Sequence, residues 1–497
     1  MENISYQSTR GGEKGISASQ AILKGLAQDG GLFMPHRVPD FDFSPKELCG
    51  KSYGEIAYRV MRLYLTDYTR EELMDCITRA YDAKFDTPGI APLKKAGDAY
   101  YLELFHGSTI AFKDMALSIL PHLLTTAARK NGVKDRILIL TATSGDTGKA
   151  AMAGFCDVEG TEIIVFFPKG GVSRVQKLQM VTQKGDNTHV VAIHGNFDDA
   201  QTGVKEIFAD KAFGAFLKQQ GISLSSANSI NIGRLVPQIV YYVYAYVQLL
   251  EKGEIAEGEK INVCVPTGNF GNILAAFLAK RMGLPIGKLI CASNENKVLF
   301  DFFQTGEYNK NRDFILTSSP SMDILISSNL ERLIYLSANG DGEKTRALMQ
   351  ELSKGGSYRI TEEMAGYMQD FTGGFATETE NFQQIKEVYQ ETGYILDTHT
   401  GVASTVYQKY KESTKDPTKT VIASTASPYK FAGDVVAALE GKKEDMDDFA
   451  LIERLHDLGA PKIPRAVLEI QKAPIRHREE CDKDQMKACV KNIIEKN

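Results

Sequence analysis

The sequence predicts an α/β protein with two doubly wound domains. Six short runs rich in β-branched and apolar residues are each followed by a helical pattern; they occupy residues 137–143, 162–168, 189–195, 261–266, 288–293 and 420–425. Nearly continuous apolar strands that alternate with helices are typical of parallel sheets covered on both faces. Because the runs are too widely separated for one small sheet, we expect two sheets. The 497 residues, of which 43% are hydrophobic, suffice for several domains.

The ends of the chain carry different patterns from its middle. Residues 1–98 show mostly helical and loop signals, and residues 441–497 are charged and helical. We therefore expect a mostly helical N-terminal region, an α/β core over 99–440 and a C-terminal helical extension. Within the core, the smaller domain should cover residues 106–200 and the larger residues 201–440.

Charge and hydropathy exclude several classes of protein. The net charge is −5 and no Lys/Arg run is present, so a nucleic-acid partner is not expected. The first residues lack the apolar core of a signal peptide. The longest apolar stretch, 235–250, contains Pro237 and two glutamines and is too short to span a bilayer, so it predicts a buried helix. We expect a cytoplasmic protein, monomeric or homodimeric, without a membrane partner.

Cysteine and histidine usage argues against a disulfide framework or a metal site. The seven cysteines form no CxxC pair and their number is odd, which is typical of reduced thiols. The eight histidines show no HExxH or similar ligand spacing. We therefore predict no bound metal.

The stretch ILILTATSGDTGKAA (137–151) resembles the end of a phosphate-binding P-loop, but its spacing differs. The first glycine of that loop is replaced by Thr143, and the hydroxyl residue after Lys149 by Ala150. A nucleoside triphosphate site, and with it an ATP-dependent kinase, is therefore a remote alternative. A strand, a turn and a helix N-terminus still suit an anion.

Lys113 lies in an apolar setting, in HGSTIAFKDMALSIL (106–120). If the helix starts at Thr109, Ile110, Lys113 and Leu117 share one face. A buried ammonium is costly unless it is paired, snorkels or is chemically altered. A desolvated lysine has a lowered pKa and forms Schiff bases, as in enzymes that use pyridoxal 5′-phosphate.

A second glycine turn, in VPTGNFGNILAAFLA (265–279), suits the phosphate of such a cofactor. A strand ends at Pro266 and a helix follows, and the turn between them holds Gly268, Asn269, Phe270, Gly271 and Asn272. Its glycines permit close approach of backbone N–H groups to an anion, and the helix adds its positive end. No magnesium ligand follows, so a phosphate monoester is favoured over a triphosphate.

Seven segments in register resemble threonine synthase, the form with a long N-terminal region. They read HGSTIAFKD, TSGDTGKAA, GNFDDAQ, NSINIGRLVPQ, PTGNFGN, LDTHTGVA and STASPYKF. The resemblance implies fold type II of the pyridoxal-phosphate enzymes, with the cofactor between two α/β domains. It also implies a β,γ-replacement, the last step of threonine biosynthesis, in which O-phospho-L-homoserine and water give L-threonine and phosphate.

The resemblance implies roles for individual residues. Lys113 should hold pyridoxal 5′-phosphate, the 268–272 turn should bind its phosphate, and the Thr425 hydroxyl should face its pyridine nitrogen. The loop expected to receive the substrate carboxylate comprises Ser144, Gly145, Asp146, Thr147 and Gly148. The segment that resembles the substrate-phosphate region contributes Asn228, Ser229, Asn231 and Arg234. Lys169 and Ser173 are further candidates.

Several alternatives stay open at this point. Thr425 could be an ordinary threonine of a strand, and Arg234 could form an ion pair at the surface. His399 could act as a base or have a structural role. Ser427 and Tyr429 replace the His and Ala of many family members. A dehydratase or a phosphohomoserine lyase of the same fold, giving 2-oxobutyrate, is the nearest alternative activity.

Overall fold

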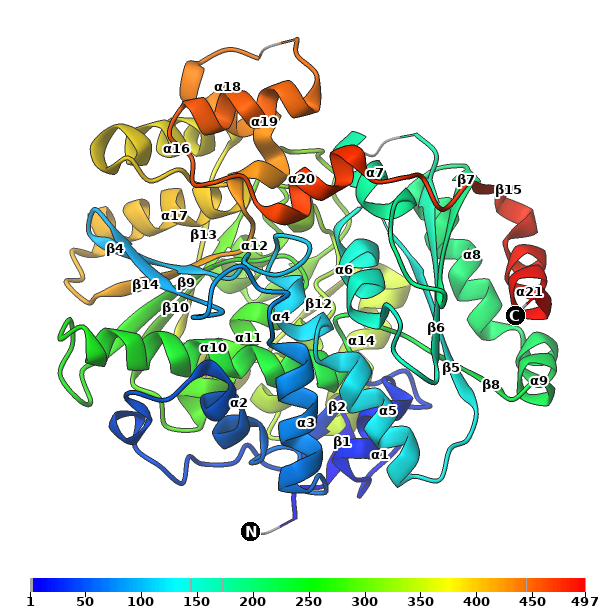
Figure 1. Ribbon diagram of the computed structural model, residues 1–497. Coiled ribbons are helices and arrows are strands. Elements are labelled where there is room, and N and C mark those ends of the chain that lie inside the picture. Colours follow the sequence, from blue (N-terminus) through cyan, green and yellow to red (C-terminus); the bar gives the residue numbers. More distant parts are fainter. Residues whose placement is uncertain (1–2, 144, 171–173, 444, 497) are drawn as a thin grey trace.

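The computed structural model describes residues 3–143, 145–170, 174–443 and 445–496. It contains two mainly parallel sheets with helices packed around them, as the sequence predicts, and an N-terminal region below them in the view of Figure 1. The elements of that region are β1 (Tyr6–Ser8), α1 (Ala18–Lys24), β2 (Phe33–Pro35), the 3-10 helix η1 (Pro45–Leu48), α2 (Tyr53–Met61) and α3 (Arg70–Ala80). Capping boxes begin α1, α2 and α3.

The larger sheet has the order β13-β10-β9-β14-β4-β3, and only its β3–β4 pair is antiparallel. Its strands are β3 (Leu93–Ala96), β4 (Ala99–Glu103), β9 (Ile261–Pro266), β10 (Ile286–Ser293), β13 (Phe371–Phe375) and β14 (Thr420–Ser424). Strands β4, β9 and β14 are buried along their whole length, because helices cover both faces of the sheet.

Helices between and after these strands supply much of the core. They are α10 (Ile232–Glu251), α11 (Gly271–Arg281), α12 (Val298–Thr305), α13 (Leu330–Ser337), α14 (Gly342–Gly355), α15 (Glu362–Tyr367), α16 (Glu378–Thr392), α17 (Thr398–Thr414) and α18 (Ala432–Glu440). Short elements among them are β11 (Glu307–Asn309), β12 (Ser357–Arg359) and the 3-10 helices η2 (Pro320–Met322) and η3 (Pro428–Phe431). The apolar stretch 235–250 lies within α10 and is almost entirely buried, so that prediction is confirmed.

The smaller sheet has the order β15-β7-β6-β5-β8 and is wholly parallel. Its strands are β5 (Arg136–Ala142), β6 (Thr161–Pro168), β7 (Thr188–His194), β8 (Ile222–Ser225) and β15 (Glu479–Asp482). The associated helices are α4 (Lys113–Leu117), α5 (Leu120–Lys130), α6 (Asp146–Phe155), α7 (Arg174–Val181), α8 (Phe197–Ala209) and α9 (Lys211–Gln219). In Figure 1, α6 and α8 lie on opposite faces of this sheet.

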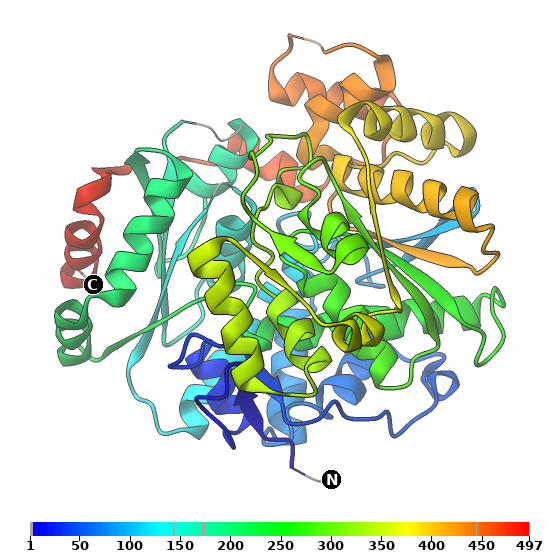
Figure 2. The same cartoon turned by 180° about the vertical axis from the view of Figure 1, so that it is seen from behind.

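The C-terminal segment runs back across the molecule to the smaller sheet (Figures 1 and 2). It contains α19 (Asp448–Asp457), α20 (Arg465–Lys472), the 3-10 helix η4 (Lys483–Gln485) and α21 (Met486–Lys496). It is not helical throughout, because β15 pairs with β7. Since β8 also joins this sheet, the smaller sheet extends beyond residue 200, where its domain was expected to end. The domain limits at residues 98 and 440 stay predictions.

None of the helices in the described ranges is both long enough and apolar enough to cross a membrane. All seven cysteines are unbridged.

Candidate active site

Three neighbouring strands of the larger sheet bring distant parts of the chain together. Strand β14 lies between β4 and β9, and all three run parallel. Lys113 follows the carboxyl end of β4, Thr425 follows β14 directly, and the turn 268–272 follows β9. In open α/β sheets, ligands bind outside the carboxyl ends of the strands. The topology therefore gathers the predicted cofactor residues at the edge where a ligand is expected.

The segment before Lys113 is an irregular turn rather than a helix. Helix α4 begins at Lys113, and Ile110 has a positive φ of 54°. The prediction of a helix from Thr109 is therefore wrong. The buried Asp114 carboxylate accepts hydrogen bonds from the backbone N–H of Thr109 (2.7 Å) and from its hydroxyl (2.6 Å), which stabilise the turn.

The same turn pairs with the residues that follow β14. The backbone N–H of Phe112 donates to the carbonyl of Thr425 at 2.8 Å, and that of Ser427 donates to the carbonyl of Ile110 at 3.0 Å. This tertiary pairing requires extended backbone at Ala111, which explains why the helix starts late. It also fixes Thr425 beside the residue that precedes Lys113.

Ser321, in η2, links Lys113 to the glycine turn. The Nζ atom of Lys113 donates to Ser321 Oγ at 3.0 Å. On its other side, the Ser321 carbonyl lies against Gly268 so closely that a Cβ atom at Gly268 would overlap with it. Glycine is thus required at position 268 by close backbone approach. The lysine and the turn 268–272 lie on either side of one residue.

The turn 268–272 has its carbonyl groups tied to the segment that follows Ser321. The Gly268 carbonyl accepts from Ser327 Oγ at 2.6 Å, and the Asn269 carbonyl accepts from the N–H (3.1 Å) and Nδ2 (2.9 Å) of Asn329. Phe270 has a φ of 65° and precedes the first residue of α11. These bonds engage the carbonyl groups of Gly268 and Asn269. The N–H groups in the first turn of α11 point away from the helix and suit an anion at its N-terminus.

Asn272 adds a buried donor to this end of α11. Its Oδ1 atom accepts from the hydroxyl of Tyr242, whereas its Nδ2 atom is buried and has no hydrogen-bond partner among the described residues. An unpartnered buried amide is costly in a folded protein. A phosphate oxygen would supply the missing acceptor, so the residues present fit the phosphate of pyridoxal 5′-phosphate.

The electrostatic surroundings make Lys113 release its proton more readily than an ordinary lysine. Burial lowers the pKa of Lys113, Asp146 acts in the opposite direction, and the charges of Lys430 and Arg234 lower the pKa further. The Asp146 Oδ2 atom is 3.4 Å from Lys113 Nζ. Burial alone would raise the pKa of Asp146, but Lys430, and Lys113 whenever it is protonated, outweigh burial and hold the pKa of Asp146 well below its usual range. A neutral amine is the form that attacks a carbonyl carbon.

The loop expected to bind the substrate carboxylate forms the start of α6. Gly145 precedes the helix with a φ of 144°, and the N–H groups of Gly145 and Gly148 both donate to Thr143 Oγ1 at 3.0 Å. Those two amides are therefore already engaged. The backbone N–H groups of Asp146 and Thr147, in the first helical turn, are the donors suited to an anion. Ser144 and Ser173 lie outside the described residues.

The segment 228–234 contributes one strong candidate, Arg234. Its guanidinium is buried; Nη1 donates to the Ala227 carbonyl at 2.8 Å, and Nε has no partner among the described residues. Burial lowers its pKa to about 10. Arg234 is therefore not a surface ion pair. A buried cation without a carboxylate partner suits an anionic ligand.

The other candidates of this segment have local structural roles. Asn231 begins α10; its Oδ1 accepts from the Gly233 N–H at 2.9 Å and its Nδ2 donates to the Ile22 carbonyl at 3.0 Å. The Ser229 carbonyl accepts from Asn329, and Asn228 is exposed. Of the four predicted residues, Arg234 is the one whose charge acts on the Lys113 pKa.

His399 orients Ser321. Its Nε2 atom accepts from the backbone N–H of Ser321 at 3.1 Å, and its Nδ1 atom lies 3.0 Å from Oδ1 of Asp397. The ring therefore has Nδ1 protonated and Nε2 free to accept. With both nitrogens engaged, the structure favours the structural interpretation of His399 over a base.

Two further lysines, Lys149 and the candidate Lys169, bond to protein partners. Lys149 is buried and donates to Gln183 Oε1 at 2.5 Å, and burial lowers its pKa to about 8. It thus bonds to the segment after α7 rather than to a ligand loop. Lys169 is half exposed and pairs with Glu480 of β15 at 2.7 Å, an arrangement that does not favour phosphate binding.

Sequence reasoning missed Ser321 and Lys430. Ser321 lies in a polar stretch of the sequence that carries no motif of its own. Lys430 lies within the segment STASPYKF, yet nothing in its spacing marks it. The structure places its Nζ atom 3.1 Å from Oδ1 of Asp146.

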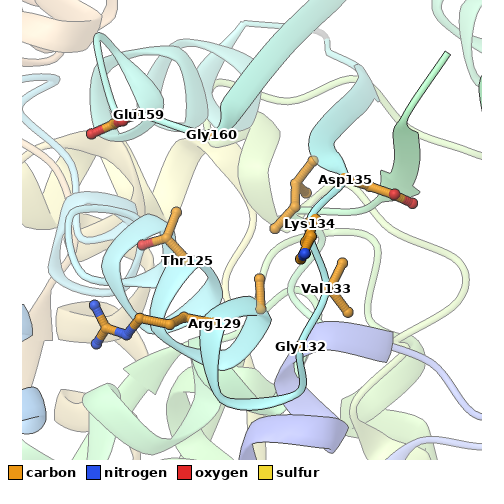
Figure 3. A pocket seen from close by; sticks show the side chains of 10 residues that line it. Thr125, Arg129, Gly132, Val133, Lys134, Asp135, Glu159 and Gly160 are labelled. Carbon is orange, nitrogen blue, oxygen red and sulfur yellow. The ribbon is translucent and has the colours of Figure 1, made fainter.

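A surface cavity of about 380 Å³ lies apart from these residues (Figure 3). It is lined by the end of α5 and the start of β5, including Arg129, Gly132 and Ile137. The candidate site lies at the opposite, carboxyl end of β5. Among the described residues, no group of three or more His, Cys, Asp or Glu side chains is placed to hold a metal ion.

Comparison with known proteins agrees with this geometry. The family model "Pyridoxal-phosphate dependent enzyme" matches residues 88–426, and the models "Threonine synthase N terminus" and "Threonine synthase, C-terminal" match residues 5–81 and 400–477. Threonine synthase from Schizosaccharomyces pombe is 39% identical over 88% of this chain and 89% of that protein. The chain belongs to the threonine synthase family.

Solved structures support the same grouping. The crystal structure of PLP-bound threonine synthase from Brucella melitensis superposes with a TM-score of 0.88, covers 99% of both chains and is 34% identical. Threonine synthase-like 1 of Macaca fascicularis is 40% identical over 92% of this chain, but this chain spans only 63% of that longer relative.

The departures from the threonine synthase pattern have structural explanations. Ser427 caps η3, since its hydroxyl accepts from the Tyr429 N–H at 3.4 Å. Tyr429 is buried and donates its hydroxyl to the carbonyl of Pro461. In this member of the threonine synthase family, the tyrosine therefore ties the end of β14 to the C-terminal segment.

Proposed function

We propose that this chain converts O-phospho-L-homoserine and water into L-threonine and phosphate, using pyridoxal 5′-phosphate held by Lys113. One observation carries the proposal: the Lys113 amine and the turn 268–272 meet on either side of Ser321, at the carboxyl ends of neighbouring strands. Family membership and the unpartnered Asn272 amide add support.

The proposed cofactor contacts follow from the donors present. The first turn of α11 and Asn272 Nδ2 would hold the phosphate, Lys113 Nζ the aldehyde carbon, and Thr425 the pyridine nitrogen. A neutral hydroxyl, unlike a carboxylate, would leave that nitrogen largely unprotonated. When bound, the cofactor supplies an electron sink for the carbanion formed at the substrate α-carbon.

The remaining steps fall to groups of this chain. The Lys113 amine would act as the base that removes the α-proton. The first-turn amides of α6, at Asp146 and Thr147, hold the substrate carboxylate. Arg234 stabilises the charge that develops on the departing phosphate. Ser321 keeps the Lys113 amine directed at the reacting carbon.

The experiment is a product analysis with the purified chain loaded with pyridoxal 5′-phosphate. We expect threonine and inorganic phosphate from O-phospho-L-homoserine in a 1:1 ratio. Formation of 2-oxobutyrate in place of threonine would assign the chain to the dehydratases or phosphohomoserine lyases. Release of phosphate from ATP without a visible cofactor band would favour the kinase alternative, against which the missing magnesium hydroxyl at Ala150 argues.

Three finer features belong to the same proposal. We infer a cytoplasmic location, a monomer or homodimer, and fold type II in the sense of the tryptophan synthase β-chain. The net charge of −5 is consistent with a protein that binds neither nucleic acid nor membranes. Sedimentation of the purified chain tests the oligomeric state.

A further inference from the structure

Asp146 lies between two buried lysines that come from different parts of the chain. Its Oδ2 atom is 3.4 Å from Nζ of Lys113, and its Oδ1 atom is 3.1 Å from Nζ of Lys430. The side chains of Lys113 and Asp146 are each 12% exposed, and that of Lys430 is 1% exposed. One carboxylate therefore lies within reach of two lysine amines in a site largely shielded from water.

The orientation of the carboxylate is fixed by Ser321. The Ser321 hydroxyl donates to Asp146 Oδ2 at 3.2 Å and accepts from Lys113 Nζ at 3.0 Å. Ser321 is in turn held by His399 through its backbone N–H. Because these bonds form a closed triangle, Oδ2 of Asp146 stays directed toward the Lys113 amine.

Lys430 cannot move away from the carboxylate without losing a second bond. Its Nζ atom also donates to the carbonyl of Thr109 at 2.9 Å, in the turn that precedes Lys113. The fixed charge of Lys430 acts on the nearby amine through Asp146. Arg234, from α10, is a further cation that faces Lys113, and the His399 ring is a titratable group that faces Asp146. Asp114 and Lys149 are the other titratable groups that act on or with Lys430.

We propose that Asp146 is the shared countercharge of this site and that Lys430, acting through Asp146, keeps the Lys113 amine neutral and reactive toward a carbonyl carbon. Since Lys430 already neutralises the carboxylate, a second ammonium at Lys113 lacks a full partner and releases its proton more readily. The inference rests on the proposed function of Lys113. It makes Asp146 and Lys430 positioning residues. Asp146 then contacts the substrate carboxylate through its backbone N–H and not through its side chain.

The first test measures the Lys113 amine directly. The full-length chain, freed of cofactor, is labelled with acetic anhydride across a pH series, and acetylation of Lys113 is quantified by mass spectrometry. Lys430→Met should raise the midpoint of labelling by about one pH unit, and Asp146→Asn should lower it by about the same amount. Lys430→Arg retains the charge and should leave the midpoint near that of the wild type.

A merely structural role gives a different result. If a substitution only admits water, the amine returns toward its ordinary pKa, and both Lys430→Met and Asp146→Asn raise the midpoint. Lys149→Met is the matched control, because Lys149 is an equally buried lysine that bonds to Gln183; it should leave the midpoint unchanged. An upward or absent shift in Asp146→Asn, or no upward shift in Lys430→Met, overturns the proposal. Asp146→Asn separates the two interpretations, because they predict opposite shifts for it. If it fails to fold, the absence of an upward shift in Lys430→Met still overturns the proposal, and Lys430→Arg, which keeps the charge, should hold the wild-type midpoint.

The second test uses the holoenzyme and no substrate. The visible absorbance of the cofactor-loaded full-length chain is titrated with pH, and its midpoint should move in the same directions, because the same nitrogen atom binds the proton. If the labelling midpoints shift as expected while the loaded chain makes no threonine, the charge arrangement stands and the proposed function fails. If threonine forms while the midpoints stay unshifted, the proposed function stands and the charge arrangement is overturned.

Discussion

The Nζ atom of Lys113 lies 3.0 Å from the Oγ atom of Ser321, 208 positions later in the chain. Ser321 also lies against Gly268, at the start of the second glycine turn. A serine in a 3-10 helix thus connects the reactive amine with the proposed phosphate-binding turn. The predictions that follow address these contacts.

Replacing Lys113 removes the proposed attachment point of the cofactor. Lys113→Ala should lack the visible band at roughly 410–430 nm that is typical of pyridoxal 5′-phosphate bound to a lysine. The measurement is an absorbance spectrum after incubation with cofactor and gel filtration. Circular dichroism should remain that of the wild type, and persistence of the band would place the attachment elsewhere.

A methyl group at position 268 should weaken cofactor binding. In Gly268→Ala, the new Cβ atom overlaps with the Ser321 carbonyl, and overpacking of this kind typically costs about 1–3 kcal/mol. We expect the Kd of pyridoxal 5′-phosphate, measured by fluorescence titration, to rise about tenfold or more. Gly214→Ala in α9 is the control, because its Cβ atom meets nothing within 4 Å. Equal affinities of the two variants would contradict the close approach.

Removing the Ser321 hydroxyl should reduce turnover without loss of the cofactor. Ser321→Ala deletes the bonds to Lys113 and Asp146, and a hydrogen bond to a charged group contributes about 1.5–3 kcal/mol. We therefore expect kcat, measured by phosphate release, to fall at least about tenfold. The exposed Ser413 offers a matched control, Ser413→Ala. A kcat within about twofold of the wild type would show that the hydroxyl does not position the amine.

Arg234 should govern the affinity for the phosphorylated substrate. Arg234→Met removes a buried, partly unpartnered guanidinium, and we expect KM for O-phospho-L-homoserine to rise about tenfold or more. The visible cofactor spectrum should be unchanged. Lys169→Met, which removes a half-exposed lysine paired with Glu480, should leave KM unaffected. If Lys169→Met has the larger effect, the phosphate site lies toward β15.

His106 should make part of the stability dependent on pH. Burial alone would lower its pKa, but hydrogen bonds to Asp86 (2.6 Å) and Glu103 (3.0 Å) outweigh burial and raise the pKa to about 9. Because the pKa of His106 is higher in the folded state than in the unfolded state, protonation of His106 stabilises the fold. The full stabilisation is present at pH values below the unfolded-state pKa of about 6.5, and it is lost as the pH rises through 9. It amounts to about 1–3 kcal/mol.

Thermal melting of His106→Gln checks this dependence. Relative to the wild type, Tm of the variant should be lower at pH 6, and the difference should shrink toward pH 10. His456→Gln, at an exposed position of α19, is the control and should follow the wild type at every pH. A difference that grows with pH would reverse the assigned sign.

The sequence by itself determined the strands and the glycine turns. All six predicted strands are present within two residues of their expected bounds, because runs buried on both faces must be apolar throughout. The turn 268–272 and Lys113 were identified as well, since a glycine turn before a helix and a lysine in an apolar run are local patterns. The local pattern also suggested a helix from Thr109, but pairing with Thr425 and Ser427 overrode it.

Only the tertiary structure decided how these pieces combine into a site. Ser321, Lys430 and Asp146 converge on Lys113 from three separate segments, and no spacing in the sequence records that they meet. The order of strands β4, β14 and β9 in one sheet brings their carboxyl ends together, although β14 is the last of the three in the sequence. Local propensity acts over a few residues, whereas the charge on an amine depends on every buried group within several ångströms, whatever its position in the sequence.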